Sequence, residues 1–264
     1  MIKSDLHSHT SFCDGNHSPE EMVLSAIQKD VQTIGFSGHS YVDFDDCCMS
    51  EENTGLYIRE ICRLKKKYAG QIEIFCGLEK DFLSNQDIAP FDYVIGSVHY
   101  LKIGDEYLTL DYTPEILKNG IDRYFDGDPI ALCEAYYEAV GNVAEKTGCD
   151  IIGHFDLISK FNESDVIFDH NDPRYINAWK KAVDHLLKYN LPFEINTGAI
   201  SRGYRSDPYP SKDIREYIRS NGGTFVLNSD SHHKDTIAYR FDDYLSEIAD
   251  CDGSDDLLRK TRKR

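Results

Sequence analysis

The chain has 264 residues, of which 41% are hydrophobic and 28% charged, and its formal net charge is −17. This length and composition allow a sizeable core, argue against a disordered chain and fit one large α/β domain. The 46 acidic and 29 basic side chains would repel most of a phosphate-rich polymer, so we expect no nucleic-acid partner. No stretch approaches the roughly 20 apolar residues of a membrane span, and no apolar signal-peptide core follows the first residue. These absences predict a cytoplasmic protein that binds no membrane, and they leave the oligomeric state open.

Short apolar runs alternate along the chain with longer helical patterns. The predicted strands are Ile2–Leu6, Thr33–Ser37, Ile72–Gly77, Tyr93–Val98, Ile151–His154, Phe193–Asn196 and Thr224–Asn228. The predicted helices are Pro19–Lys29, Glu52–Tyr68, Pro129–Lys146, Pro173–Tyr189, Ser211–Ser220 and a last one near Lys234–Ile248. This alternation favours a parallel sheet, and seven strands favour a barrel over an open sheet.

The remaining segments complete a single-domain prediction. Leu101–Leu110 reads as a hairpin around Gly104-Asp105, and residues 155–172 read as a long loop. No linker divides the chain, so we expect one domain over residues 1–250 and a polar, basic tail over residues 251–264. Ser18 before Pro19 predicts a helix cap, and Ser211 precedes a helical pattern in the same way.

Histidines gather at one predicted end of the strands. Six of the ten lie at or just after the carboxyl end of a strand: His7, His9, His39, His99, His154 and His232. In parallel α/β barrels that end carries the active site, because residues far apart in the sequence meet there. Each histidine alone would more often be a buried, hydrogen-bonded residue or a surface residue. Together they predict a metal site.

Carboxylates accompany these histidines. His7 and His9 are two residues apart in an extended segment, so both imidazoles can face one metal ion, and Asp5 could orient one of them. Asp230 and His232 repeat this spacing after the last strand, although Ser-Asp-Ser alone would read as a polar turn. Glu79 follows the third strand, and its two oxygens could bridge two ions.

The other histidines and the cysteines carry weaker signals. His185 lies inside a helical pattern and His170 in a polar loop, so we expect neither to bind metal. His17 competes with Asp14 as a ligand, and His233 could support its neighbour or face solvent. The eight cysteines contain no C-x-x-C pair, so we expect reduced thiols rather than a disulfide framework.

Read together, the motifs resemble a known family. They are Asp5-Leu6-His7-Ser8-His9-Thr10, Asp14-Gly15, Gly38-His39-Ser40, Gly77-Leu78-Glu79, Gly96-Ser97-Val98-His99, Gly153-His154 and Ser229-Asp230-Ser231-His232. In this order they resemble the polymerase and histidinol phosphatase (PHP) superfamily over nearly the whole chain. Residues 153–161, 194–198 and 209–211 look like its histidinol-phosphatase branch. The resemblance implies a distorted (β/α)7 TIM-like barrel and a metal-dependent phosphoesterase with three divalent ions, Zn²⁺, Mn²⁺ or Fe²⁺.

The resemblance also implies roles for single residues. The three metal sets would be His7, His9, Glu79 and Asp230; Glu79, His99 and His154; and Asp14, His39 and His232. Arg202, Arg205 and Lys160 are candidates to bind the phosphate, with Arg202 the first choice. Apart from the resemblance, the reaction itself suggests His39, His232 and Asp156 as possible helpers of the leaving alkoxide, and the charge of loop acids could select a cationic substrate: Asp43, Asp45, Asp46 and Glu106.

The expected reaction is hydrolysis of L-histidinol phosphate, a small phosphate ester, by attack of a metal-bound hydroxide on phosphorus. Nucleotides, sugar phosphates and phosphotyrosine are alternative substrates, because the pocket rather than the fold decides the substrate. A polymerase-associated nuclease is disfavoured by the acidic charge. A scaffold that binds metal without catalysis is disfavoured by the complete ligand sets.

Overall fold

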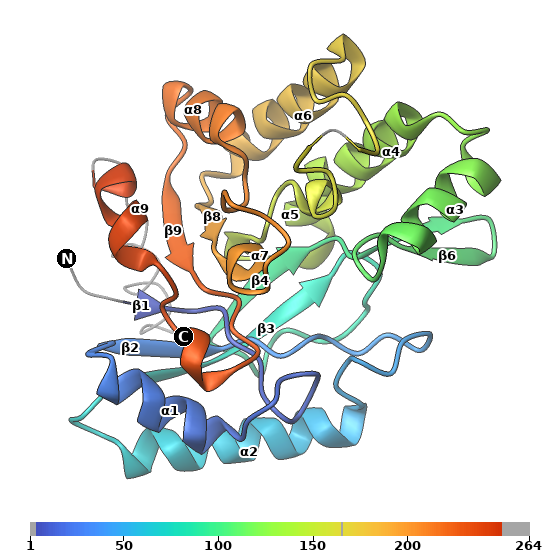
Figure 1. Ribbon diagram of the computed structural model, residues 1–264. Helices are drawn as coiled ribbons and strands as arrows, with labels where there is room; N and C mark the ends of the chain where they lie inside the picture. Colours follow the sequence, from blue (N-terminus) through green and yellow to red (C-terminus); the bar gives the residue numbers. More distant parts are fainter. Residues whose placement is uncertain (1–3, 165, 250–264) are drawn as a thin grey trace.

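The structure is a computed structural model that describes residues 4–164 and 166–249, and its centre is a sheet of seven strands (Figure 1). The order is β1-β2-β3-β4-β7-β8-β9, and all neighbours run parallel, as predicted. The strands are β1 (Ser4–Asp5), β2 (Thr33–Phe36), β3 (Glu73–Asp81), β4 (Tyr93–Ser97), β7 (Ile151–Ile152), β8 (Phe193–Asn196) and β9 (Phe225–Asn228). The start of the predicted strand Ile2–Leu6, the proposed tail 251–264 and Cys251 lie outside the described residues.

Backbone bonds beyond the strands bring the first and last strands together. His9 N donates to the Ser231 carbonyl at 2.8 Å, and Ser231 N donates to the His7 carbonyl at 3.2 Å. Ser8 and Ser231 form a parallel bridge. The sheet is therefore a nearly closed barrel surrounded by helices, which confirms the predicted distorted (β/α)7 fold.

The third strand is longer than the sequence predicted. We expected it to end at Gly77, where the apolar run stops, but β3 continues through Glu79 to Asp81 and stays paired with β4. Glu79 and Asp81 are buried there, 1% and 3% exposed. Buried carboxylates need polar partners, and histidines from the neighbouring strand ends surround Glu79 and Asp81 at this end of the barrel.

One aromatic side chain fills the barrel interior. Tyr93 of β4 is fully buried in a small cluster with Leu6 of the first segment and Ile95 of its own strand. Its ring lies against the backbones of Gly35 and Gly77, where an added Cβ would come within 2.2 Å of Tyr93 atoms. These two glycines are required so that the ring fits.

Helices cover the outside of the barrel in two groups (Figure 1). The helices α1 (Pro19–Gln28) and α2 (Glu51–Lys67) pack apolar residues on β2 and β3. The helices α4 (Pro129–Gly141), α6 (Pro173–Leu186) and α8 (Lys212–Ser220) pack on β4, β8 and β9. Burial of these faces accounts for most of the hydrophobic stabilisation.

Several helix predictions need correction. The helix expected over Pro129–Lys146 breaks at Asn142 into α4 and α5 (Val143–Thr147), and Asn142 caps the first part. The helix expected over Lys234–Ile248 consists of the 3-10 turn Lys234–Thr236 (η3) and α9 (Phe241–Ile248). Ala238 and Arg240 between them have positive φ, which interrupts the helix. The predicted helix over Pro173–Tyr189 ends in a 3-10 turn, η2 (Leu187–Tyr189).

Two helices were not predicted. α3 (Pro114–Tyr124) follows the hairpin, and its signals are Thr113 as a hydrogen-bonded cap and proline at the first position. α7 (Gly198–Ser201) is a single turn after β8. The predicted hairpin is confirmed as β5 (Tyr100–Ile103) and β6 (Glu106–Thr109), and the expected long loop contains a 3-10 turn, η1 (Leu157–Ser159).

The two predicted serine caps have different outcomes. Ser18 caps α1, as expected, and also forms a reciprocal capping box with Glu21. Ser211 makes no side-chain cap bond; its hydroxyl instead donates to the buried carboxylate of Asp156. Within the described residues, no helix is long and apolar enough to cross a membrane.

Candidate metal centre

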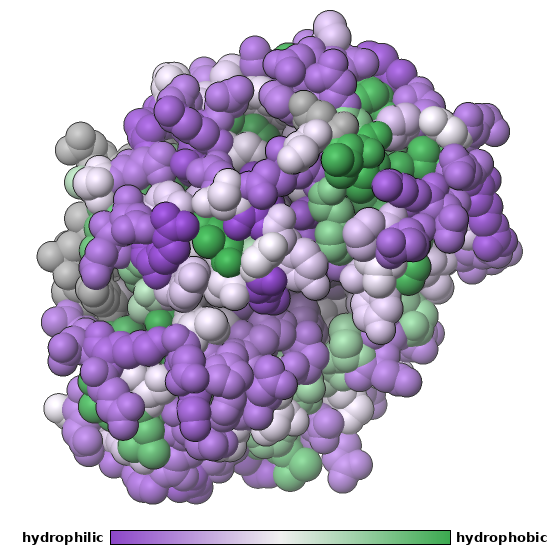
Figure 2. Space-filling view, in the orientation of Figure 1, coloured by the Kyte–Doolittle hydropathy of each residue, from purple (hydrophilic) through white to green (hydrophobic). Residues whose placement is uncertain are grey.

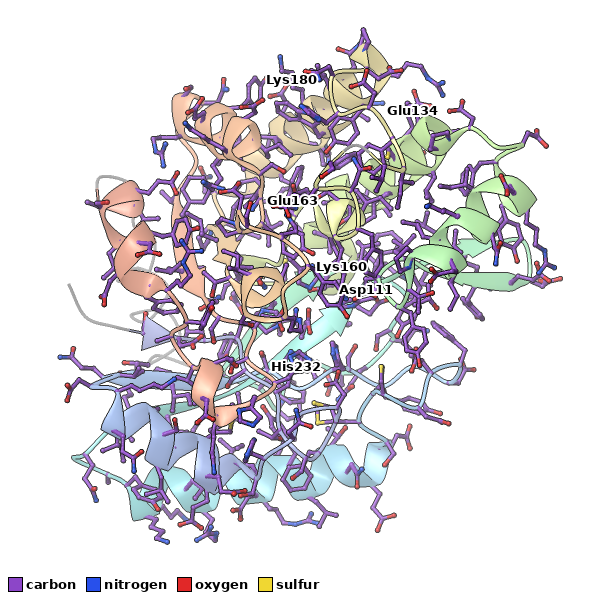
Figure 3. The ribbon with its side chains drawn as sticks, in the orientation of Figure 1. Asp111, Glu134, Lys160, Glu163, Lys180 and His232 are labelled. Atoms are coloured by element: carbon purple, nitrogen blue, oxygen red, sulfur yellow. The ribbon has the colours of Figure 1, made fainter. Side chains whose placement is uncertain are left out.

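The nine residues predicted as metal ligands meet at the carboxyl end of the barrel. They come from the ends of six strands and the segment after β1: His7, His9, Asp14, His39, Glu79, His99, His154, Asp230 and His232. Figure 3 shows His232 in the middle of this end of the molecule. The surrounding face is largely hydrophilic (Figure 2).

Glu79 is the centre of the cluster. Its Oε1 lies 2.8 Å from His154 Nε2 and 3.3 Å from His99 Nε2. Its Oε2 lies 3.3 Å from His7 Nε2, 3.4 Å from His9 Nε2 and 3.0 Å from His39 Nδ1. The two oxygens thus face different histidines, which is the arrangement a bridging carboxylate needs.

Two further groups flank Glu79. Asp230 Oδ1 lies 3.3 Å from His9 Nε2 and 3.7 Å from His7 Nε2. Asp14 lies 3.1 Å from His232 Nε2 and 3.6 Å from His39 Nε2. In each group one ligand atom per residue lies within 4.8 Å of the others.

Unsatisfied buried atoms indicate that cations fit here. His7 Nε2, His9 Nε2 and Glu79 Oε2 are buried and have no hydrogen-bond partner, and all three point into the cluster. An orphaned buried polar atom costs about 1–3 kcal/mol, so several in one place call for a ligand. Mixed imidazole and carboxylate donors suit Zn²⁺, Mn²⁺ or Fe²⁺.

The protonation of the metal-free cluster gives the same indication. Burial disfavours the protonated form of His7, but the carboxylates of Glu194, Glu79 and Asp230 outweigh burial and raise the pKa of His7. Burial lowers the pKa of His9 to about 3, with help from neighbouring histidines. Burial also opposes the shift of His99, yet Glu79 and Asp81 raise its pKa to about 10. Without metal, protons therefore supply part of the positive charge that the buried carboxylates require.

Carboxylates behind the cluster fix the histidines, and sequence reasoning did not assign them. Glu194 of β8 accepts from His7 Nδ1 at 2.6 Å and from His154 N at 2.9 Å. Asp81 Oδ2 lies 3.2 Å from His99 Nδ1. Such partners set the tautomer of a ligand histidine. The sequence gives only a weak signal for Asp81, which lies two residues after Glu79 and therefore on the same side of the strand.

Asp5 has a different role from the one expected. It was predicted to orient a histidine ligand, but its carboxylate accepts from Ser229 N at 3.0 Å, from Ser229 Oγ and from Ala238 N. Asp5 therefore fixes the backbone just before Asp230. Asp230 itself has φ of 50°, a conformation that aspartate tolerates better than most residues.

The remaining histidines lie apart from the cluster. His17 packs on His233, with ring centroids 4.3 Å apart, and accepts from Lys234 N at 3.4 Å. The structure therefore places Asp14, not His17, in the group with His39. His185 packs on Tyr189 within the helix and turn at the end of α6, and His170 is exposed in its loop.

The three candidate phosphate-binding cations occupy different places. Arg202 donates to Asp230 Oδ2 at 3.0 Å and contacts His232 Nδ1 at 3.0 Å, so it lies at the cluster. Lys160 Nζ donates to the carbonyl of Asp111 at 2.7 Å and to its Oδ2 at 3.1 Å. The Arg205 side chain is 7% exposed and bonds Ser159, Ser211 and Asp156.

Asp156 contacts Arg205 and Ser211 and does not belong to the groups of candidate metal ligands. Its side chain is fully buried, and its Oδ2 accepts from Ser211 N at 3.0 Å and lies 3.4 Å from Arg205 Nη1. These contacts join the segment after β7 to the start of α8.

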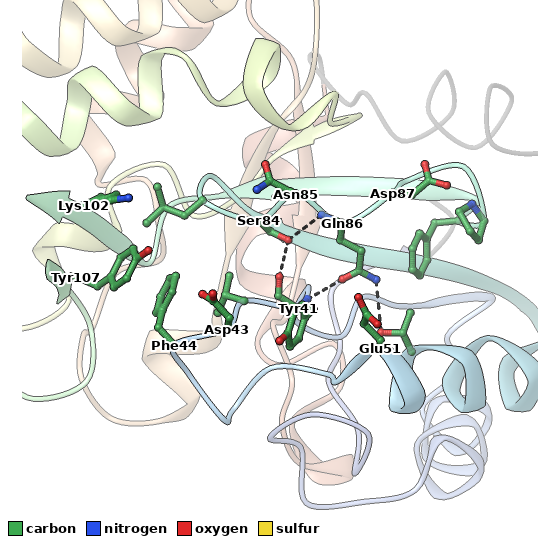
Figure 4. Close-up of a pocket in the computed structure, with 15 residues that line it drawn as sticks. Tyr41, Asp43, Phe44, Glu51, Ser84, Asn85, Gln86, Asp87, Lys102 and Tyr107 are labelled. Carbon is green, nitrogen blue, oxygen red and sulfur yellow. Dashed lines mark hydrogen bonds between the residues drawn. The ribbon is translucent and has the colours of Figure 1, made fainter. Parts of the chain in front are cut away.

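The loop acids predicted to select a cationic substrate are dispersed. Asp43 lies between Tyr41 and Phe44 and lines a cavity of about 710 Å³ that the segment after β3 also borders (Figure 4). Asp45 accepts from Tyr100 Oη at 2.8 Å, and Glu106 accepts from Tyr124 Oη at 2.5 Å.

Comparisons with known proteins give the family of the chain. The model of the PHP domain family matches residues 5–198. Histidinol-phosphatase of Bacillus subtilis is 27% identical over 270 residues, covering 93% of this chain and 99% of that protein.

Two solved structures share the fold. A histidinol phosphatase candidate from Listeria monocytogenes has a TM-score of 0.81 and 24% identity, covering 92% of this chain and 100% of the other. Histidinol phosphate phosphatase from Lactococcus lactis, solved with zinc, L-histidinol and phosphate, has a TM-score of 0.65 and 24% identity, covering 88% and 87%. With its ordered motifs, its barrel and the match over most of its length, the chain belongs to the PHP domain family.

Proposed function

We propose that this protein is a metal-dependent phosphomonoesterase that hydrolyses L-histidinol phosphate to L-histidinol and phosphate. The observation that carries the proposal is the convergence of nine candidate ligand side chains, eight of them around the buried Glu79, with several of their donor atoms unsatisfied. The named activity of the relatives supports the choice of substrate.

Three divalent ions, Zn²⁺, Mn²⁺ or Fe²⁺, would be held by the nine residues. His7, His9, Glu79 and Asp230 would hold the first ion, and Glu79, His99 and His154 the second. Asp14, His39 and His232 would hold the third, with His9 also within reach. When bound, the ions would lower the pKa of a coordinated water and neutralise charge on the phosphoryl oxygens.

The chain's own groups would orient the ester. Arg202 lies at the cluster and presents a planar guanidinium, which suits two phosphate oxygens at once. Lys160, at the end of the turn that follows β7, would add a second positive charge. Both would stabilise charge that develops on the phosphoryl group.

The leaving alkoxide needs a proton, and His39 and His232 remain the candidates to hold it. Both are part-exposed, at 15% and 21% of the side chain, whereas His7 and His9 are fully buried. The buried contacts of Asp156 with Arg205 and Ser211 support a positioning role for that residue.

A substrate panel tests the proposal. Metal-reconstituted protein is assayed for phosphate release from L-histidinol phosphate, nucleotides, sugar phosphates and phosphotyrosine. We expect a strong preference for L-histidinol phosphate and loss of activity in His7→Ala and Glu79→Ala, while the exposed control His170→Ala stays active. A preference for another ester would refute the substrate, and a covalent phosphoenzyme trapped during turnover would refute direct attack by water.

A further inference from the structure

An ion pair outside the nine ligands stands next to two of them. Asp111 directly follows Leu110, whose N donates to the His99 carbonyl at 3.0 Å. Lys160 ends a turn that begins where Leu157 N donates to the His154 carbonyl at 2.9 Å. The pair therefore joins the segments that follow two neighbouring cluster histidines, whose ring centroids are 5.0 Å apart. Figure 3 shows Asp111 and Lys160 side by side near the centre of the molecule.

The lysine of this pair is held firmly. Its side chain is 11% exposed, and Nζ donates to both the carbonyl and the carboxylate of Asp111. The rings of Tyr204 and Phe161 lie 4.9 and 5.5 Å from Nζ. Lys160 therefore has a fixed position that does not depend on the carboxylate alone, because the bond to the Asp111 carbonyl and the two rings also hold it.

The carboxylate of Asp111 stands among groups suited to phosphate. Its Oδ2 accepts from the Lys160 ammonium at 3.1 Å, and an adjacent positive charge favours the ionised carboxylate. A negative charge at this place weakens the binding of a simple phosphate ester. Beyond holding Lys160, this carboxylate favours ligand binding if the ligand carries a cation beside its phosphate.

We infer that Asp111 binds the ammonium group of an amino-alcohol phosphate whose phosphate is held by Arg202 and Lys160. In such esters the ammonium stands on the carbon next to the one that bears the ester oxygen, so its partner must lie beside the phosphate cations. Asp111 meets this condition and belongs to none of the proposed ligand sets. The inference rests on the proposed function and names the residue that selects its substrate class.

A pair of matched substrates tests this role. L-histidinol phosphate and imidazolylpropyl phosphate differ only in the amino group, and both are assayed with wild-type protein, Asp111→Asn and Asp111→Glu. We expect kcat/KM for L-histidinol phosphate to fall about 10- to 100-fold in Asp111→Asn, since a hydrogen bond to a charged group is lost. For imidazolylpropyl phosphate kcat/KM should stay constant or rise, and Asp111→Glu should recover part of the preference.

The ratio of the two kcat/KM values is the decisive quantity, because both come from one preparation and a partly unfolded sample cannot change it. Asp105→Asn, an exposed acid in the turn of the same hairpin, is the control and should leave the ratio unchanged. Equal losses on both substrates, or no loss on either, would overturn the inference. If the wild type hydrolyses other esters but not L-histidinol phosphate, the proposed substrate fails. Ethanolamine phosphate and ethyl phosphate then test Asp111 by the same ratio.

Discussion

Replacement of Glu194 by glutamine should weaken both the fold and metal binding. Each carboxylate oxygen accepts two bonds: Oε1 from His7 Nδ1 at 2.6 Å and Asn228 Nδ2 at 2.9 Å, and Oε2 from His154 N and Asn196 Nδ2, both at 2.9 Å. A glutamine amide replaces one of these acceptor oxygens by an NH₂ donor. In either orientation of the amide, this NH₂ group faces two groups that donated hydrogen bonds to the carboxylate. Two buried bonds are then lost, at about 1–3 kcal/mol each.

The histidine tautomer adds an effect on metal binding. If the amide NH₂ faces His7, the imidazole can accept that hydrogen bond only with its proton on Nε2, the atom that points at Glu79. That tautomer cannot bind metal through Nε2. Loss of such a supporting partner typically lowers metal affinity about 10- to 100-fold.

Two assays measure these effects on Glu194→Gln. Urea unfolding of the metal-free protein should show a loss of about 2–6 kcal/mol, and competition with a zinc chelator should show the weaker metal affinity. Glu145→Gln on the exposed face of α5 is the matched control and should change neither. If Glu194→Gln stays within about 0.5 kcal/mol of wild type, the range of ordinary surface substitutions, and binds zinc equally well, our account of this network is wrong.

Three further predictions concern the core, the phosphate site and pH. Gly77→Ala should destabilise the fold by about 1–3 kcal/mol, because its Cβ would meet the Tyr93 ring at 2.2 Å, whereas Gly55→Ala in α2 has room and should stabilise it slightly; urea unfolding compares the two. Arg202→Lys should lower kcat/KM for phosphate esters by more than about 10-fold without changing the melting temperature, because lysine cannot hold two phosphate oxygens. Steady-state assays and thermal melting measure the two quantities, and an unchanged kcat/KM at an unchanged melting temperature would contradict this role of Arg202. The carboxylates that raise the pKa of His99 to about 10 stabilise the folded, metal-free protein. This stabilisation is fully present below pH about 6.5 and is lost as the pH rises through about 10. Unfolding at several pH values should show this decline in wild type but not in His99→Asn.

The sequence could bring most of the nine proposed ligands together because they lie at or just after the carboxyl end of a short apolar strand, whereas Asp14 was assigned only from the family resemblance. In a parallel barrel that position alone places a side chain at the active end. Glu79 could be found in this way even though its strand was predicted too short.

The supporting residues could not be found by the same reasoning. Glu194 lies inside an apolar strand, where a lone carboxylate gives no sign of its partners. Asp111 follows a hairpin whose packing on the barrel cannot be read from local pattern. The break at Asn142 and the interrupted last helix depend on tertiary contacts and single positive-φ residues, which periodicity does not register.

The most direct test of the central claim combines metal content with activity. Purified protein is stripped by a chelator, titrated with Zn²⁺ or Mn²⁺, and assayed for phosphate release from L-histidinol phosphate while bound metal is counted by mass spectrometry. The account predicts an inactive stripped protein, recovery of activity as metal binds up to three ions per chain, and failure of both binding and recovery in Glu79→Ala. Full activity of the stripped protein, or full metal binding and activity in Glu79→Ala, would contradict it.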